Sequence, residues 1–403
     1  MAARSARLSF GLGLACGLEA LALVVPALAL AAFLALSDRR FAPGVLTAAT
    51  SATAVLFVTL LATTPPSRWL DMRCDMLALN LPLLALFCTG GLWAALRTSL
   101  APNLVSRYAA AGGAAVAGVG LYAWLEPACL AGPMGQLNPG LNAWLGEVME
   151  TRGVFWLTAH YPAAGLSFLA FVVAGAAAQI ALFRRRPDAE AGYRVAMVLL
   201  AVLLGCWQIR LMSYASWLVI PSLAIWCASL RGSASVSRPV ATLSAVVLLS
   251  QMVLGLIIGI AVAAVRQVAP SHAAQGPDTA SCYRSSTLRR LSALPPGLIA
   301  ADIDLGPFIV ATTAHRVVAA PYHRLGKGIL ANEAILSHGP DKALAQMRAL
   351  GVGYLVLCAV PGQVAAAGSM RGALLAGGKV PMLTEIGMPS GSPIRAWRSE
   401  EAR

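Results

Sequence analysis

Acidic side chains beside apolar segments are the first candidates for chemistry in this sequence. Glu147 and Glu150 stand three residues apart, so they would share one face if that segment is helical. Such a pair could bind a divalent cation such as Mg²⁺ or Mn²⁺, and a solvated helix face is the alternative. Asp75 and Glu126 lie at the ends of two apolar runs. These four carboxylates form the candidate acidic site.

Arg210 is the candidate for binding an anionic group, because it interrupts a long apolar stretch. An ionised side chain in such surroundings is costly and is a functional candidate by default. The alternative is an arginine that extends toward water and marks the membrane boundary. Tyr214 follows one helical turn later and could share the same surface.

The segment 321–324, Pro-Tyr-His-Arg, is the most distinctive motif near the C-terminus. Its candidate binding residues are Tyr322, His323 and Arg324. A histidine beside an arginine could hold a phosphate or a sugar acceptor, and a solvated turn after a strand is the alternative. His315 and His338 could join His323 around a metal, but their spacing fits no known metal site.

Three further acids need an explanation. Glu19 lies inside the first apolar run, where a carboxylate should pair or face a polar cavity unless it lies near the membrane interface. Asp302 and Asp304 alternate along a predicted strand and would point the same way.

Composition restricts the elements that can position these residues. Of the 403 residues, 58% are hydrophobic and only 12% are charged, whereas about a quarter of an ordinary soluble domain is charged. This excludes a soluble enzyme, a disordered chain and a DNA-binding domain. The net charge of +13 comes mostly from arginines in short stretches between apolar runs. That pattern is typical of membrane proteins, so we expect membrane lipid and no nucleic acid as a partner.

Eight runs are apolar enough to be transmembrane helices. They are Leu8–Leu36, Gly44–Thr64, Met76–Leu96, Tyr108–Leu125, Pro162–Phe183, Val195–Ile209, Leu211–Leu230 and Val240–Val265. The sixth and seventh form one apolar stretch that is too long for one crossing, since about 20 residues span a bilayer. The split at Arg210 therefore predicts a tight hairpin.

Arginines in the loops predict the orientation. Alternate loops hold ten arginines, and the remaining set holds four. The richer set, which we expect on the cytoplasmic side, is Ser37–Pro43, Arg97–Arg107, Arg184–Arg194 and Arg231–Pro239. The loop 126–161, the C-terminal segment and the N-terminus then face outward. An outward N-terminus favours further helices upstream in a longer natural protein, and Arg4 and Arg7 as the start of a signal peptide are the alternative.

The segment 267–403 differs in character from the helical part, 1–266. Predicted strands are Leu298–Ala301, Phe308–Thr312, Arg316–Ala320 and Tyr354–Cys358, and Asp341–Leu350 is a predicted helix closed by Gly351. We therefore expect a mostly α fold, a polytopic membrane helix bundle of about eight transmembrane helices with a small C-terminal α/β domain outside the cytoplasm.

The cysteines of the outward segments could form disulfides. Cys74 and Cys129 both fall in outer loops, which is the oxidising side of a bacterial membrane. Cys282 and Cys358 could form a second bridge in the C-terminal domain. The alternative is four free thiols.

Five short strings, taken in order, resemble a family of uncharacterised bacterial membrane proteins of the GT-C glycosyltransferase type. They are Gly17-Leu18-Glu19-Ala20-Leu21, Arg73-Cys74-Asp75, the segment from Glu126 to Pro133, Asp304-Leu305-Gly306-Pro307 and Ala320-Pro321-Tyr322-His323-Arg324. These proteins are distant relatives of the catalytic subunits of oligosaccharyltransferase. The resemblance covers nearly the whole chain but matches the later part of the family pattern, and members are longer at the N-terminus.

The resemblance implies transfer of a sugar from a polyprenyl-phosphate donor to an envelope acceptor, at the outer surface of the bacterial inner membrane. Such a reaction needs a carboxylate to activate the acceptor hydroxyl and cations or a metal to hold the leaving phosphate. Arg210 suits the second role. The family's acid follows its first helix, where this chain has Asp38 in a predicted cytoplasmic loop, so the catalytic acid stays unassigned. A non-catalytic scaffold or partner subunit and a transporter of lipid-linked sugar are the alternatives.

Overall fold

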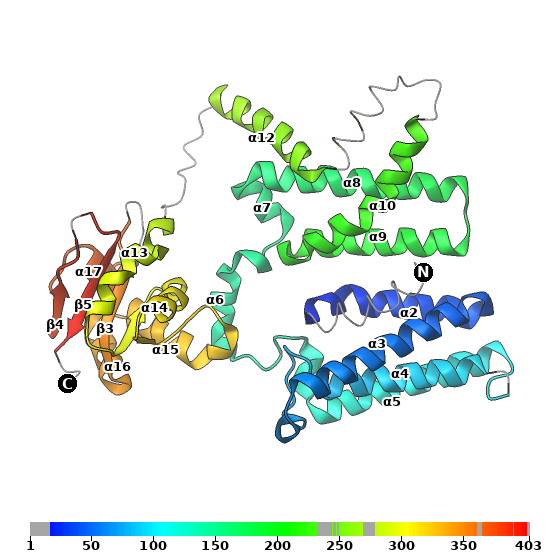
Figure 1. The fold of residues 1–403 in the computed structure, drawn as a ribbon, viewed down its shortest axis with the longest axis horizontal. Helices are drawn as coiled ribbons and strands as arrows, with labels where there is room; N and C mark the ends of the chain where they lie inside the picture. Colours follow the sequence, from blue (N-terminus) through cyan, green and yellow to red (C-terminus); the bar gives the residue numbers. More distant parts are fainter. Residues whose placement is uncertain are drawn as a thin grey trace. The chain divides into compact units, whose positions relative to one another are not determined.

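The computed structural model describes residues 17–97, 99–231, 244, 247, 250–268, 279–360, 365–389 and 391–400. The chain divides into two compact units (Figure 1). The helical unit comprises 1–136 and 146–270, and the sheet unit comprises 137–145 and 271–403. Residues 8–16 of the first apolar run and much of 240–249 lie outside the described residues.

The helical unit is built from long apolar helices. They are α2 (Leu21–Ser37), α3 (Ala42–Thr63), α4 (Asn80–Leu96), α5 (Leu104–Leu125), α7 (Val154–His160), α8 (Pro162–Arg185), α9 (Ala189–Trp207), α10 (Met212–Arg231) and α12 (Gln251–Val268). The short helix α6 (Asn142–Glu147) precedes α7. Large apolar side chains such as Val116, Leu203 and Trp217 are exposed on the helices, as they would be against lipid. The long apolar helices suggest a multi-pass membrane protein.

The expected number of eight spans needs a correction. Six helices of the described residues have the length and composition to cross a membrane, ending at Ser37, Thr63, Leu125, Arg185, Trp207 and Ser229. The third run forms a helix of only 17 residues, because the chain stays irregular until Asn80. Cys74, in that irregular segment, is held by a disulfide to Cys129. Of the eighth run, the described apolar helix is Gln251–Val265, and most of residues 240–249 lie outside the described part of the chain.

Small residues allow the helices to pack closely. A Cβ atom at Gly91 of α4 would lie 2.2 Å from the Ala114 Cβ of α5. A Cβ at Gly175 of α8 would lie 2.2 Å from the Val219 Cβ of α10. Close approach at small residues is a usual source of helix association in lipid, because apolar burial itself gives no advantage there.

Contacts between loops agree with the alternation expected from the arginines. Arg107 donates to the Leu36 carbonyl at 3.3 Å, and the hydroxyls of Ser37 and Tyr108 lie 2.7 Å apart. These contacts join two segments that both belong to the arginine-rich set. The Cys74–Cys129 disulfide joins two segments of the other set. Segments assigned to one side by their charge therefore meet in the structure.

The sheet unit contains a five-stranded mixed sheet with helices on both faces (Figure 1). The strands are β1 (Leu298–Ala301), β2 (Arg316–Val317), β3 (Val352–Cys358), β4 (Leu383–Ile386) and β5 (Ile394–Ser399), in the order β2-β1-β3-β5-β4. β1 pairs parallel with β2 and β3, whereas β5 pairs antiparallel with β3 and β4. The helices are α13 (Ser285–Leu288), α14 (Gly306–Thr312), α15 (Gly326–Ser337), α16 (Pro340–Leu350) and α17 (Met370–Leu375). All seven residues of β3 are buried, as expected for a central strand covered on both faces.

Some local predictions for the sheet unit were correct. β1 lies where it was predicted, and α16 ends at Gly351, whose φ of +68° suits glycine. Others were wrong. Phe308–Thr312 belongs to helix α14, in which Pro307 occupies the first turn, and the inward residues Leu305 and Ile309 follow helical spacing.

The predicted strand Arg316–Ala320 is shorter than expected, since β2 contains only Arg316 and Val317. Asp302 and Asp304 do not alternate along a strand, because β1 ends at Ala301 and a 3₁₀ turn follows it at once.

Candidate functional site

Arg210 lies in a tight hairpin between two membrane-type helices, as predicted. α9 ends at Trp207, the short 3₁₀ helix Ile209–Leu211 makes the turn, and α10 begins at Met212. Leu211 is buried, whereas the Arg210 side chain remains 26% exposed. The hairpin therefore places the guanidinium at the end of the helices, beyond their apolar length.

Two carboxylates meet this guanidinium. Arg210 Nη2 donates to Glu150 Oε2 at 3.0 Å, and Arg210 Nη1 lies 3.3 Å from Glu19 Oε1. The Nε of Arg210 is buried and has no hydrogen-bond partner among the described residues. We call Glu19, Glu150 and Arg210 the outer triad. Its formal charge is −1, with one cationic group between two anionic ones.

Glu19 reaches the outer triad because it lies at the start of a helix and not in its middle. The 3₁₀ turn Leu18–Ala20 leads directly into α2, which begins at Leu21. Ala20 and Val24 are buried in a small cluster against which Tyr214 packs. Of the alternatives that the sequence left open for this acid, the structure shows a position at the start of a helix together with an ion pair to Arg210.

Glu150 is positioned by the backbone of its own loop. It lies in the 3₁₀ turn Met149–Thr151, and the Ile209 N–H donates to the Arg152 carbonyl at 2.9 Å. A Cβ at Gly153 would lie 3.1 Å from two carbonyl oxygens near the end of α9, so glycine permits this close approach. The loop is thus fastened to the Arg210 hairpin directly after Glu150.

The helical pair expected from Glu147 and Glu150 does not form. Glu147 is the last residue of α6, and Glu150 belongs to a separate 3₁₀ turn. Glu150 pairs with Arg210 instead.

Glu126 has a structural role next to the Cys74–Cys129 disulfide. Its carboxylate accepts from the Ala128 N–H at 3.2 Å and from Gln136 Nε2 at 3.0 Å. Gln136 also donates to the Met72 carbonyl and accepts from the Cys74 N–H. Asp75 follows Cys74 directly in this segment. The Glu126 carboxylate therefore holds these two loops together next to the disulfide.

The Pro-Tyr-His-Arg motif belongs to the sheet unit, after β2. Tyr322 is exposed, and His323 and Arg324 begin a 3₁₀ turn that leads into α15. The rings of Tyr322 and His323 lie 5.2 Å apart, and the Arg324 guanidinium lies 5.7 Å from the Tyr322 ring. The three side chains gather on one turn. His315, in contrast, is buried and bonds to the Leu291 carbonyl.

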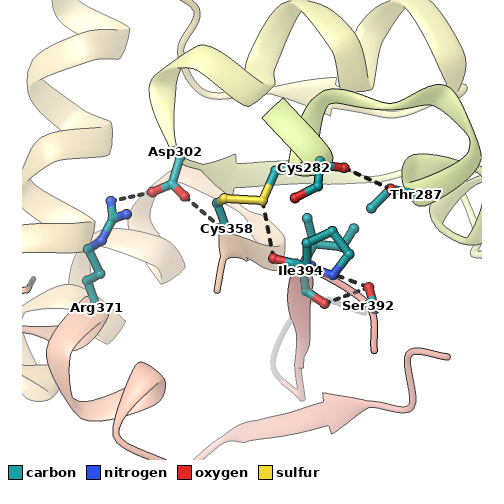
Figure 2. Close-up of a disulfide and its surroundings, with 9 residues drawn as sticks. Cys282, Thr287, Asp302, Cys358, Arg371, Ser392 and Ile394 are labelled. Atoms are coloured by element: carbon teal, nitrogen blue, oxygen red, sulfur yellow. Dashed lines mark hydrogen bonds and ion pairs between the residues drawn. A yellow bond between two sulfur atoms is a disulfide. The ribbon is translucent and has the colours of Figure 1, made fainter. Parts of the chain in front are cut away.

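A second group of polar residues in the sheet unit lies beside the Cys282–Cys358 disulfide (Figure 2). Asp302 follows β1 directly, accepts from the Cys358 N–H at 2.7 Å and is paired with Arg371. Burial raises the pKa of Asp302, and the Arg371 charge opposes this shift. Burial also raises the pKa of Asp304. The Asp302 carboxylate thus joins β1, β3 and α17, which is a structural role.

Metal-ligating side chains do not form a cage in the described part of the chain, where no group of three or more His, Cys, Asp or Glu side chains could hold an ion. The outer triad supplies two carboxylates. Mg²⁺ is commonly held by one or two carboxylates together with substrate phosphates and water, so this donor set suits a cation that arrives with a phosphate.

Comparison with known proteins adds no relative to this description. No family model matches the chain, and no curated protein matches it.

Proposed function

We propose that this chain is a GT-C-type membrane glycosyltransferase, or part of one, that transfers a sugar from a polyprenyl-phosphate donor to an envelope acceptor. The observation that supports the proposal is the outer triad, in which an arginine at a helix hairpin lies between two carboxylates. Function rests on a site and not on a fold, and this site has the required types of group at one place.

In the proposed reaction, the bond from the anomeric carbon to the phosphate oxygen breaks, and a bond from that carbon to an acceptor oxygen forms. The acceptor proton passes to a carboxylate, and polyprenyl phosphate leaves with the additional negative charge. Glu19 is our candidate for this base, because it is the less exposed of the two acids, at 46% against 60%. Arg210 would stabilise the leaving phosphate.

The cation and the location follow from the same proposal. Mg²⁺ or Mn²⁺ would be held between the Glu150 carboxylate and the donor phosphate, where it would offset their mutual repulsion. The triad would face the outer surface of a bacterial inner membrane. The C-terminal domain would lie on the same side, where Tyr322, His323 and Arg324 are candidates for contacts to the acceptor.

The test is a turnover assay that requires no knowledge of the acceptor. Membranes containing the chain are supplied with a panel of short-chain polyprenyl-phosphate sugars and a native envelope extract, and mass spectrometry detects released polyprenyl phosphate. The proposal expects release with at least one donor and a fall of 10²- to 10⁴-fold for Glu19→Gln, the usual contribution of a general base. Glu126→Gln is the matched control, because Glu126 bonds only within its own loops among the described residues. Equal rates for the wild type and Glu19→Gln would contradict the assignment of Glu19.

A further inference from the structure

Two cavities in the helical unit share Tyr193 as a wall. The larger has a volume of about 610 Å³ and lies among α2, α8, α9 and α10. The smaller has a volume of about 330 Å³ and lies among α2, α3 and the start of α9. Both volumes fall in the range of about 300–1,000 Å³ that is typical of ligand sites. The Tyr193 hydroxyl donates to the Ala27 carbonyl of α2 at 3.3 Å, which fixes the ring between the two spaces.

The charged residues that line these cavities belong to the opposite end of the helices from the outer triad, whereas the apolar lining of the larger cavity extends along α2 to Leu23. Arg194 lies near the start of α9, and Arg210 lies just after its end. From Arg194 to the end of α9 at Trp207 the helix rises about 20 Å at 1.5 Å per residue. The charged rim of both cavities is therefore separated from the triad by about two thirds of the thickness of a membrane core.

The cavity walls are apolar, and the charged residues stand at one end. Arg186, Asp188 and Arg194 line the larger cavity, and Arg40 and Glu190 line the smaller one. Gln179 and Ser222 also line the larger cavity, where the Ser222 hydroxyl donates to Gln179 Oε1 at 2.7 Å. Each cavity thus offers an apolar interior below a charged rim.

Three arginines and two acids line the rim, and Arg40 is paired with Asp38, so the positive charge that favours an anion comes from Arg186. Arg194 pairs with Glu190 at 2.5 Å, and Asp188 caps α9 through the Ala191 N–H. Arg186 has no ion-pair partner within the described residues, and it extends the run Arg184–Arg186 at the end of α8. Arginine binds phosphate oxygens well, since its guanidinium presents two parallel donors.

We propose that this end of the helical unit binds an anionic diacyl phospholipid. Its phosphate would bind Arg186 and Arg194, and one acyl chain would enter each cavity, on either side of Tyr193. Two neighbouring apolar spaces under one cationic rim match a ligand with two chains and one anionic head. Each buried methylene contributes to affinity, so both chains are needed for strong binding. By the distribution of loop arginines this lipid belongs to the cytoplasmic leaflet.

The experiment is native mass spectrometry of the delipidated full chain in detergent. The probes are phosphatidylglycerol, phosphatidylcholine, lysophosphatidylglycerol and inorganic phosphate. We expect phosphatidylglycerol to bind at least fivefold more tightly than phosphatidylcholine and than the single-chain lipid, and not to be displaced by millimolar phosphate. The double variant Arg186→Gln/Arg194→Gln should lose the preference for the anionic lipid.

Arg185→Gln is the matched control, because Arg185 is exposed at the same helix end and lines neither cavity. It should keep the preference. The proposal is overturned if the wild type binds both diacyl lipids equally, or if Arg185→Gln and the double variant lose the preference equally. If lysophosphatidylglycerol binds as tightly as phosphatidylglycerol, the arrangement with one acyl chain in each cavity is refuted. If millimolar inorganic phosphate displaces phosphatidylglycerol, the site binds phosphate alone and the lipid proposal is also overturned.

Discussion

Replacement of Arg210 separates a structural role from a catalytic one most clearly. Its partners Glu19 and Glu150 are 46% and 60% exposed, so the two ion pairs are screened by water. Exposed pairs of this kind contribute about 0.2–1 kcal/mol each to stability. The folded state of Arg210→Gln should therefore lose at most about 2 kcal/mol.

The expected loss of activity is much larger. Removal of one preorganised donor to a developing charge costs about 2.7–4 kcal/mol in the transition state, or 10²- to 10³-fold in turnover. Arg210→Gln should reduce the release of polyprenyl phosphate by that factor. Arg210→Lys should retain part of the rate, since it keeps the charge but not the forked donor geometry.

Arg73→Gln provides the control for ion-pair loss. Arg73 lies 3.2 Å from Asp71, and both side chains are 50% exposed. Turnover and thermal unfolding are measured in the same membranes for both variants. The reasoning is refuted if Arg210→Gln retains normal turnover, or if its loss of activity follows a loss of folded protein.

Three further predictions concern packing, the disulfide and pH. Gly175→Ala should destabilise the helical unit by about 1–3 kcal/mol through overpacking. Gly112→Ala is the control and should not destabilise it, because the space around the Cβ position of Gly112 is open. Thermal unfolding in detergent compares the two variants. The Cys282–Cys358 disulfide spans 76 residues, and its loss should destabilise the sheet unit by about 2–5 kcal/mol. Unfolding of the Cys282→Ser/Cys358→Ser variant measures this loss, and an unchanged unfolding midpoint would contradict the prediction. A hydrogen bond from Arg395 lowers the pKa of Glu385. The stabilisation that this ion pair gives the folded state should be complete above the ordinary pKa of a glutamate and should fall as the pH decreases through the lowered pKa. Glu385→Gln should remove this part of the acid dependence of unfolding.

The sequence predicted the positions of the apolar helices but not how many are long enough to cross a membrane, because apolar runs and breaks are local signals whereas helix ends depend on tertiary contacts. The hairpin at Arg210 was predicted from the length of one apolar stretch and the charge within it. The length of α4 was not predicted, because the start of this helix depends on the disulfide that joins the segment around Cys74 to a distant loop. Local patterns also failed at Phe308–Thr312, where β-branched residues favoured a strand but Pro307 and the packing of Ile309 favour a helix.

The candidate site was predicted as separate residues and not as a group. Arg210 and Glu150 were both candidates, but they are 60 residues apart and their contact depends on a backbone bond between two loops. Glu19 was expected to pair or to face a polar cavity, unless it lay near the membrane interface. Its partner could not be named, since nothing in the sequence shows which helix ends meet.

The decisive experiment is binding of polyprenyl phosphate to the purified full chain in nanodiscs, because it requires neither the sugar nor the acceptor. We expect saturable binding that weakens at least tenfold in Arg210→Gln and stays unchanged in Arg73→Gln. Equal affinity in the wild type and Arg210→Gln would contradict the assignment of the outer triad as the site of the lipid phosphate.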